Sequence, residues 1–102
     1  MPQKLKYLGV PVFMDGQNYY VPSLSVCDFR AHYDDLVKQF PPETPFEEIY
    51  NHYAPIILLA VNRNYPDLSG EQLEKMFDLY TFKLAIKAVQ AASGIEPVSE
   101  GE

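Results

Sequence analysis

The sequence predicts one small, mainly α-helical domain, with three or four helices that follow a short N-terminal β-hairpin. Three stretches begin with helix-capping residues and continue with apolar residues at helical spacing. Near the start, an Asp-Gly pair separates two runs rich in Val, Phe and Tyr, which indicates a tight hairpin. A chain of 102 residues suits one hydrophobic core. We expect the domain to span residues 1–95, and residues 96–102 to form a disordered acidic tail.

The predicted hairpin covers residues 7–22. Gly16 lies at its turn and can adopt the positive φ that a tight turn needs. Pro11 and Pro22 have no N–H group to donate to a neighbouring strand, so we expect them on edge strands or at strand ends. Because a lone hairpin is marginally stable in water, it should pack on the helices that follow or on another chain.

The first helix is predicted to begin at Ser25, whose hydroxyl would cap the first turn. Asp28 in that turn favours the positive end of the helix dipole. We expect Pro41-Pro42 to end the helix, because neither residue supplies an N–H group. The apolar positions that share one predicted face are Val26, Phe29, Tyr33, Leu36, Val37 and Phe40.

The second helix is predicted from Thr44 as the N-cap, Pro45 at the first helical position and Glu47 as the partner in a capping box. Pro55 lies within the pattern and should either kink this helix or divide it into two segments. Residues 56–61, IILLAV, are apolar on every side. This favours a central helix in the domain over one buried against another subunit.

Ser69 and Gln72 are predicted to cap a third helix. Thr81 is a candidate cap for a fourth, although the third and fourth helices could also be continuous. Gly94 is expected to end the last helix as a C-terminal cap. The apolar positions are Leu73, Met76, Phe77 and Tyr80 in the third helix, and Leu84, Ala85, Ala88, Val89 and Ala92 in the fourth.

The charge balance argues against nucleic acid and anionic membranes as partners. Eight basic residues face fourteen acidic ones, for a net charge of −6, and the basic residues form no cluster that would release counterions from phosphates. The longest apolar run, residues 53–61, is about half a membrane span. The N-terminal residues lack the apolar core and cleavage site of a signal peptide, so we expect no export by that route.

The residue inventory also argues against an enzyme. Cys27, the single cysteine, lies five positions from His32, which places the two on different faces of one helix. One cysteine and two isolated histidines do not supply the three or four ligands of a zinc site. The adjacent carboxylates at 34–35 and 47–48 point about 100° apart on a helix, which suits solvent-facing charges better than acid–base catalysis. We expect no catalytic residue, no metal and no cofactor.

The aromatic residues are more numerous than a small core can enclose, with eight Tyr and six Phe. Tyr is favoured where an interface is half polar. An aromatic face that binds other proteins is therefore one interpretation, and ordinary scatter of aromatics over the surface is the other. The residues expected to emerge from the core, on the second and third helices, are Tyr50, Tyr53, Phe77 and Tyr80. The same surplus of apolar surface predicts self-association.

Residues 58–69, LLAVNRNYPDLS, resemble the A-L-x-R-N-Y-P-D-L-[ST] signature of small tail assembly chaperones of long-tailed bacteriophages. The similarity extends over about residues 10–95, with departures at Pro55 and at residues 80–82. The positions that match the signature residue by residue are Arg63, Asn64, Tyr65, Pro66, Asp67, Leu68 and Ser69.

The signature also has a structural interpretation. Asn64 can end a helix in the left-handed conformation, and Pro66 prevents the helix from continuing. Asp67 or Ser69 would start the next helix, while Tyr65 would pin the corner to the core. By this interpretation the motif identifies a fold and is not itself a binding site.

The resemblance implies a chaperone in the cytoplasm of an infected bacterium. Such proteins bind the tape measure protein before the tail tube polymerises around it, keep its apolar helices from aggregating, help to recruit tail tube subunits, and are absent from the finished virion. In the family a longer frameshifted product often occurs as well. The alternatives are a structural head–tail connector or adaptor that stays in the particle and, less consistent with the residue inventory, an enzyme subunit or small hydrolase.

Overall fold

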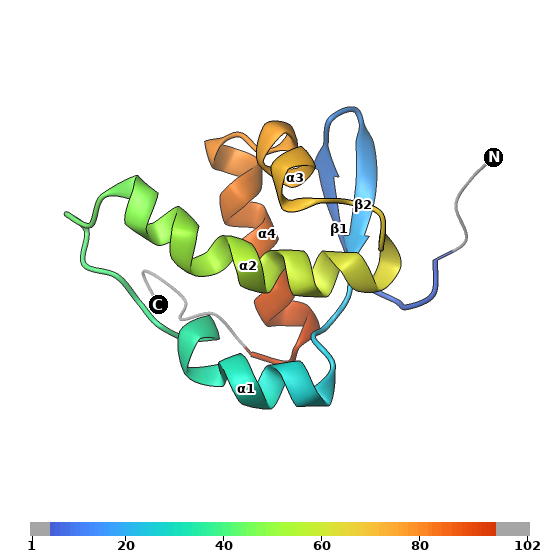
Figure 1. The fold of residues 1–102 in the computed structure, drawn as a ribbon, viewed down its shortest axis with the longest axis horizontal. Helices are drawn as coiled ribbons and strands as arrows, with labels where there is room; N and C mark the ends of the chain where they lie inside the picture. The colour runs from blue at the N-terminus through green and yellow to red at the C-terminus, as the bar shows by residue number, and fades with distance from the viewer. Residues whose placement is uncertain (1–4, 96–102) are drawn as a thin grey trace, which may run out of the picture.

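A computed structural model describes residues 5–95, which form a β-hairpin followed by four helices in the order β1, β2, α1, α2, α3, α4 (Figure 1). The prediction of a mainly helical domain with an N-terminal hairpin is confirmed. Helix α2 crosses the middle of the molecule, with α1 on one side of it and α3 and the hairpin on the other (Figure 1). The expected acidic tail, residues 96–102, lies outside the described residues.

The hairpin pairs β1 (Val10–Met14) with β2 (Gln17–Val21) in antiparallel register, with Met14 opposite Gln17. Asp15 and Gly16 form the two-residue turn with φ values of 53° and 83°. A type I′ turn requires positive φ at both central positions, which is why Asp-Gly predicted this hairpin correctly. The hairpin packs on α4 and α2, with Val12 and Met14 buried and the intervening Phe13 exposed.

Helix α1 (Val26–Leu36) begins as predicted, because the Ser25 hydroxyl accepts a hydrogen bond from the Asp28 N–H at 3.1 Å. The predicted end at Pro41-Pro42 is wrong, since the helix stops at Leu36. Side chains from other helices bind the carbonyl groups at this end: His52 Nε2 donates to Asp35 at 2.8 Å and Gln90 Nε2 to Leu36 at 3.0 Å. In a longer helix these carbonyls would accept hydrogen bonds from the N–H groups of the next turn; here the two side chains supply the donors.

The predicted apolar face of α1 is also partly wrong. Leu36 is buried, and Phe29, Val37 and Phe40 are partly buried. Val26 and Tyr33, however, are 75% and 46% exposed. Helix α1 lies at the edge of the fold and packs mainly on α2, so only a narrow strip of its surface is covered.

Helix α2 (Phe46–Asn64) begins one residue later than Thr44 predicts. Pro45 occupies the N-cap position in an extended conformation, and its carbonyl accepts from the N–H groups of Glu48 and Ile49 at 3.1 and 3.3 Å. No side chain caps this end. Pro55 does not divide the helix, whose ribbon changes direction about halfway along (Figure 1).

The central position predicted for residues 56–61 is confirmed. Helix α2 contacts α1, α3, α4 and β2. The core lies between α2, α4 and the hairpin. Its buried apolar residues are Val12, Met14, Val21, Leu24, Leu36, Tyr53, Ile56, Ile57, Ala60, Val61, Leu73, Phe82, Ala85, Ala88 and Val89.

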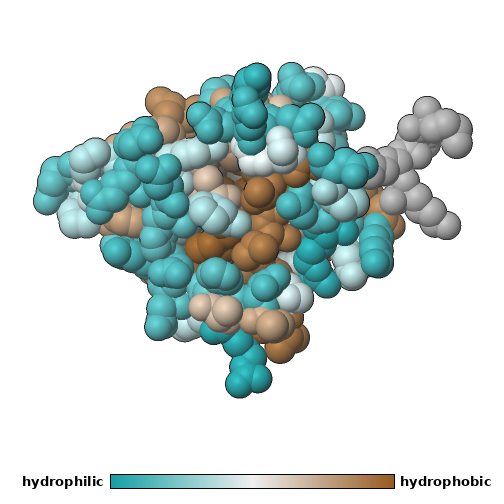
Figure 2. Space-filling model, viewed as in Figure 1, coloured by the Kyte–Doolittle hydropathy of each residue, from teal (hydrophilic) through white to brown (hydrophobic). Residues whose placement is uncertain are grey.

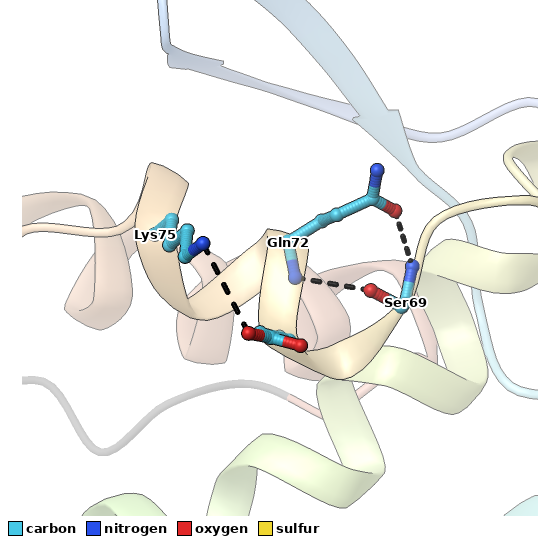
Figure 3. A network of polar contacts seen from close by, with 4 residues as sticks. Ser69, Gln72 and Lys75 are labelled. Atoms are coloured by element: carbon cyan, nitrogen blue, oxygen red, sulfur yellow. Dashed lines mark hydrogen bonds and ion pairs between the residues drawn. The ribbon is translucent and has the colours of Figure 1, made fainter.

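Helix α3 (Gly70–Met76) begins with the predicted capping box, in which the Gln72 N–H donates to the Ser69 hydroxyl at 3.1 Å and the Ser69 N–H to the Gln72 side chain at 2.9 Å (Figure 3). An exposed ion pair between Lys75 and Glu71, at 3.9 Å, lies on the same helix (Figure 3). Exposed pairs of this kind contribute little to stability.

Helix α4 (Leu79–Ala92) is separate from α3, which settles the alternative that the sequence left open. Its N-cap is Asp78, so the prediction of Thr81 as the cap is wrong. Thr81 instead occupies the third position of the capping box, where its N–H donates to Asp78 Oδ1 at 2.8 Å. Past its C-cap, Gly94 adopts a positive φ of 84°, as expected for a helix end.

The Asp78 carboxylate predicts a pH dependence of stability. The N–H and then the hydroxyl of Thr81 lower the pKa of Asp78 below its usual value of 3.8. A carboxyl whose folded pKa is depressed stabilises the fold above its unfolded pKa, and this contribution disappears as the pH falls through the folded pKa. Asp78→Asn keeps a capping side chain but not the charge. We therefore expect the melting temperature of Asp78→Asn to lie below wild type at pH 7, with the difference closing below pH 3.8.

Thermal unfolding followed by circular dichroism between pH 7 and pH 2.5 measures this difference. Asp34→Asn, on the exposed side of α1, controls for the general effect of removing one carboxylate. A constant difference between wild type and Asp78→Asn across this range would contradict the assignment.

Candidate functional site

The four aromatic residues predicted to bind other proteins lie in different environments in the structure. Tyr53 is 7% exposed, and its hydroxyl donates a hydrogen bond to the Lys38 carbonyl, so it belongs to the core between α1 and α2. Tyr50 and Phe77 are partly buried and line one groove. Tyr80 is 70% exposed on α4 beside that groove but is not part of its lining.

This aromatic groove has a volume of about 370 Å³ and lies between the N-terminal turns of α2 and the connection from α3 to α4. In Figure 1 these segments lie on the same side of the molecule. The lining residues are Phe46, Glu47, Tyr50, Asn51, Glu74, Phe77, Asp78, Leu79 and Phe82.

Phe82 forms the base of the aromatic groove. It is 2% exposed, and its ring centroid lies 5.6 Å from Phe46, 5.0 Å from Tyr50 and 5.7 Å from Phe77. Phe46 and Tyr50 are four residues apart on α2 and so share one face of the helix. Phe77 reaches the same site because it leaves α3 in an extended conformation, with φ −77° and ψ 142°. The rings of α2 and of the connection between α3 and α4 therefore meet around one side chain of α4.

Two large apolar side chains in the lining of the aromatic groove are in contact with solvent. Phe46 is 47% exposed and Leu79 is 63% exposed. Tyr80, the next residue on α4, is also exposed but does not line the groove. Isolated exposed apolar residues are ordinary in proteins, but a contiguous group around a cavity marks an interaction site.

The rim of the aromatic groove is acidic. Glu47, Glu74 and Asp78 all belong to its lining, which contains no Lys or Arg. Burial, and then the negative charge of Glu74, raise the pKa of the Tyr50 hydroxyl above its usual 10.0. Tyr50 is therefore neutral at physiological pH, and the charge at this site is negative.

A second cavity, of about 450 Å³, lies beside β2. Its walls combine Leu and Tyr side chains with polar ones, and they include Asn18, Tyr20 and Tyr65. The Tyr65 hydroxyl accepts a hydrogen bond from the Tyr20 N–H at 2.9 Å, so this polar group of the wall is used to attach β2 to the corner after α2. The aromatic groove is the better candidate for a protein partner because its lining includes large apolar side chains, Phe46 and Leu79, that remain exposed.

The signature residues form the corner between α2 and α3. Asn64 is the last residue of α2 and is 3% exposed. Its side-chain oxygen accepts from the N–H groups of Lys6 and Tyr7 at 3.1 and 2.8 Å, and its nitrogen donates to the carbonyls of Tyr7 and Tyr20 at 3.0 and 2.9 Å. The expected left-handed conformation at Asn64 is wrong, because among described non-glycine residues only Asp15 has a positive φ.

The other signature residues hold the same corner. Arg63 donates to the Ser23 carbonyl at 2.7 Å and lies 4.0 Å from the centroid of the Tyr7 ring. Tyr65 packs edge-on against Tyr19 with centroids 5.1 Å apart. Ser69 caps α3, Leu68 is partly buried, and Pro66 and Asp67 are exposed.

Several residues with a role in the corner or the groove were not predicted from the sequence. Asn62, just before the signature core, donates to the carbonyls of Tyr65 and Leu68 at 3.0 and 2.8 Å. Phe46 and Phe82 were not among the residues predicted to bind a partner, although the four-residue spacing of Phe46 and Tyr50 on a predicted helix was a usable signal. No local pattern connects Phe82 to them, because that contact joins residues from distant parts of the chain.

The described residues hold no group of three or more His, Cys, Asp or Glu side chains that could bind a metal. Cys27 is exposed, and His52 is bonded to the end of α1. None of the described helices is both long and apolar enough to cross a membrane.

No family model, curated protein or solved structure matches this chain.

The Asn64 side chain predicts a large stability loss on truncation. Asn64→Ala would remove the hydrogen-bond partner of partly buried N–H and C=O groups in the N-terminal segment and β2, which costs about 1–3 kcal/mol. Urea unfolding measures this change. Asn51→Ala, on the exposed side of the same helix, is the matched control and should stay near wild type. Equal unfolding free energies for the two variants would show that the amide does not hold the corner.

Proposed function

We propose that this protein is a tail assembly chaperone of a long-tailed bacteriophage that binds the tape measure protein, helps to recruit tail tube subunits and leaves before the virion is complete. The observation that carries the proposal is the aromatic groove, which presents half-exposed rings on a fixed base. The resemblance of residues 58–69 to the chaperone signature gives this binding surface its proposed client.

The aromatic groove has the features of a site for an amphipathic helix. Helix-in-groove recognition inserts a few apolar side chains, spaced by three or four residues, between the walls of an apolar cleft. The exposed faces of Phe46 and Leu79 would be buried by such a helix, and burial of apolar surface contributes about 25 cal/mol per Å². A tape measure protein is long and helical, so its unassembled form needs reversible cover of this kind. No nucleotide is required for this mechanism.

In this proposal the signature residues have a structural role. It fixes the corner from which α3 starts, and α3 carries Glu74 and leads into Phe77. The motif is then a support for the binding surface and makes no contact with the client itself.

The alternative function is a head–tail connector or adaptor that remains in the particle. Apolar residues exposed away from the groove favour it, since a permanent component needs more than one interface: Leu8 is 97% exposed and Phe13 is 61% exposed. Mass spectrometry of purified virions separates the two functions, because only the connector is retained. A tape measure gene directly downstream would favour the chaperone.

If the aromatic groove binds the client, replacing Phe46, which is 47% exposed, should weaken client binding. Co-expression with the tape measure protein of the same genome should keep that client in the supernatant. Phe46→Ser should weaken binding by about 1–3 kcal/mol, or about 5- to 150-fold, and release the client to aggregate.

Tyr33→Ser on α1 is the matched control, because Tyr33 is 46% exposed and lies outside the aromatic groove. Circular dichroism establishes that both variants are folded. If folded Phe46→Ser holds the client as well as Tyr33→Ser does, the groove is not the client site, and the edge of the N-terminal hairpin becomes the next candidate, through strand addition.

Self-association is a further expectation of this function. The exposed Leu8, Phe13 and Val26 leave apolar surface that a second copy would cover. Multi-angle light scattering at micromolar concentration should give a mass above the 11.7 kDa of one chain. A strict monomer at these concentrations would refute it.

A further inference from the structure

The acidic residues of the aromatic groove are placed around its apolar base by three different elements. Glu47 lies in the first turn of α2, Glu74 lies on α3, and Asp78 caps α4. All three line the same groove as the rings of Phe46 and Phe77. A ligand seated on the rings therefore meets negative charge from several directions.

These charges have no cationic partner in the described part of the chain. Between residues 5 and 95, the ion pair present is Lys75–Glu71, on the exposed surface of α3. Asp78 is engaged by the Thr81 N–H and hydroxyl, which keep its pKa low and the carboxylate ionised. Glu74 is close enough to Tyr50 for its charge to raise the pKa of that hydroxyl. Binding a neutral or acidic segment here would bring these carboxylates out of water without compensation.

We infer that the aromatic groove takes an amphipathic helix whose apolar face is flanked by Lys or Arg. This inference rests on the proposed function and specifies which segment of the client is bound. The apolar side chains of the helix contact the rings, while its basic side chains reach Glu47 and Glu74 at the rim. Exposed ring faces such as that of Phe46 also attract cations. Complementary charge at a rim mainly raises the association rate and selects among otherwise similar apolar helices.

Two synthetic peptides test the inference with the full chain. Both carry the same Leu residues at helical spacing, and they differ only in having Lys or Glu on either side of that apolar face. Fluorescence anisotropy at low ionic strength should show binding of the Lys peptide about tenfold or more tighter than that of the Glu peptide. The difference should shrink as salt screens the rim charges. Equal binding of the two peptides, or no binding of either, would overturn the inference.

A double variant locates the charges responsible. Glu47→Gln with Glu74→Gln removes two negative charges from the rim and should abolish most of the preference for the Lys peptide. Glu43→Gln with Glu48→Gln removes two negative charges from exposed positions outside the aromatic groove and should leave the preference intact. If both double variants lose the preference equally, the effect comes from net charge, and the inference fails.

The outcomes separate this inference from the proposed function. Suppose that wild type and the Glu47/Glu74 variant hold the tape measure protein equally well, and that neither prefers one of the two peptides. In that case the chaperone function stands and the charge selection fails. If the Lys peptide is selected but the wild-type chain does not hold the tape measure protein, the groove specificity stands without that client. Conversion of an oligomer to a monomer by Phe46→Ser would assign the groove to a second copy of this chain and would overturn the inference.

Discussion

The fold depends on the hydrogen bonds of one buried side chain, Asn64. Its amide joins the end of α2 to the N-terminal segment through Lys6 and Tyr7, and to β2 through the Tyr20 carbonyl. These segments are 44 to 58 residues away in the sequence. A two-stranded hairpin is marginally stable alone, so it needs attachment of this kind. Buried backbone groups are costly without partners, and the Asn64 side chain supplies both a donor and an acceptor. The hairpin and the central helix are therefore joined by side-chain hydrogen bonds as well as by packing.

The same corner sets the position of the aromatic groove. Asn62 bonds the carbonyls of the connection that follows α2, and the Ser69 capping box then fixes the direction of α3. A second capping box, at Asp78, turns the chain into α4 and leaves Phe77 directed at the Phe82 ring. The positions of the rings therefore depend on the corner through a series of local hydrogen bonds. A motif that lies outside the groove can in this way determine whether the groove exists.

The elements predicted correctly are those that local rules decide. Asp15-Gly16 specifies a hairpin turn, Ser25 and Ser69 satisfy the first N–H groups of their helices, and the all-apolar stretch at 56–61 requires a central position. The errors arise where distant residues decide. The end of α1 is determined by side chains of α2 and α4 that bind its last carbonyls, and the sequence around Leu36 carries no sign of them. The base of the groove was missed for the same reason, since Phe82 meets Phe46 only through the packing of α4 on α2.

Tyr53 and Tyr50 show how two aromatic residues of one helix come to differ in exposure. They are three residues apart on α2, yet Tyr53 is buried because its hydroxyl finds the Lys38 carbonyl and its ring packs on Phe40. Tyr50 lies where α1 has diverged from α2, and its neighbours there are Phe46, Phe82 and the charge of Glu74. Within residues 5–95 no further helix covers this end, so the rings cover one another and stay partly in solvent. In the proposed function, a partner helix would bury the parts of these rings that stay in contact with solvent.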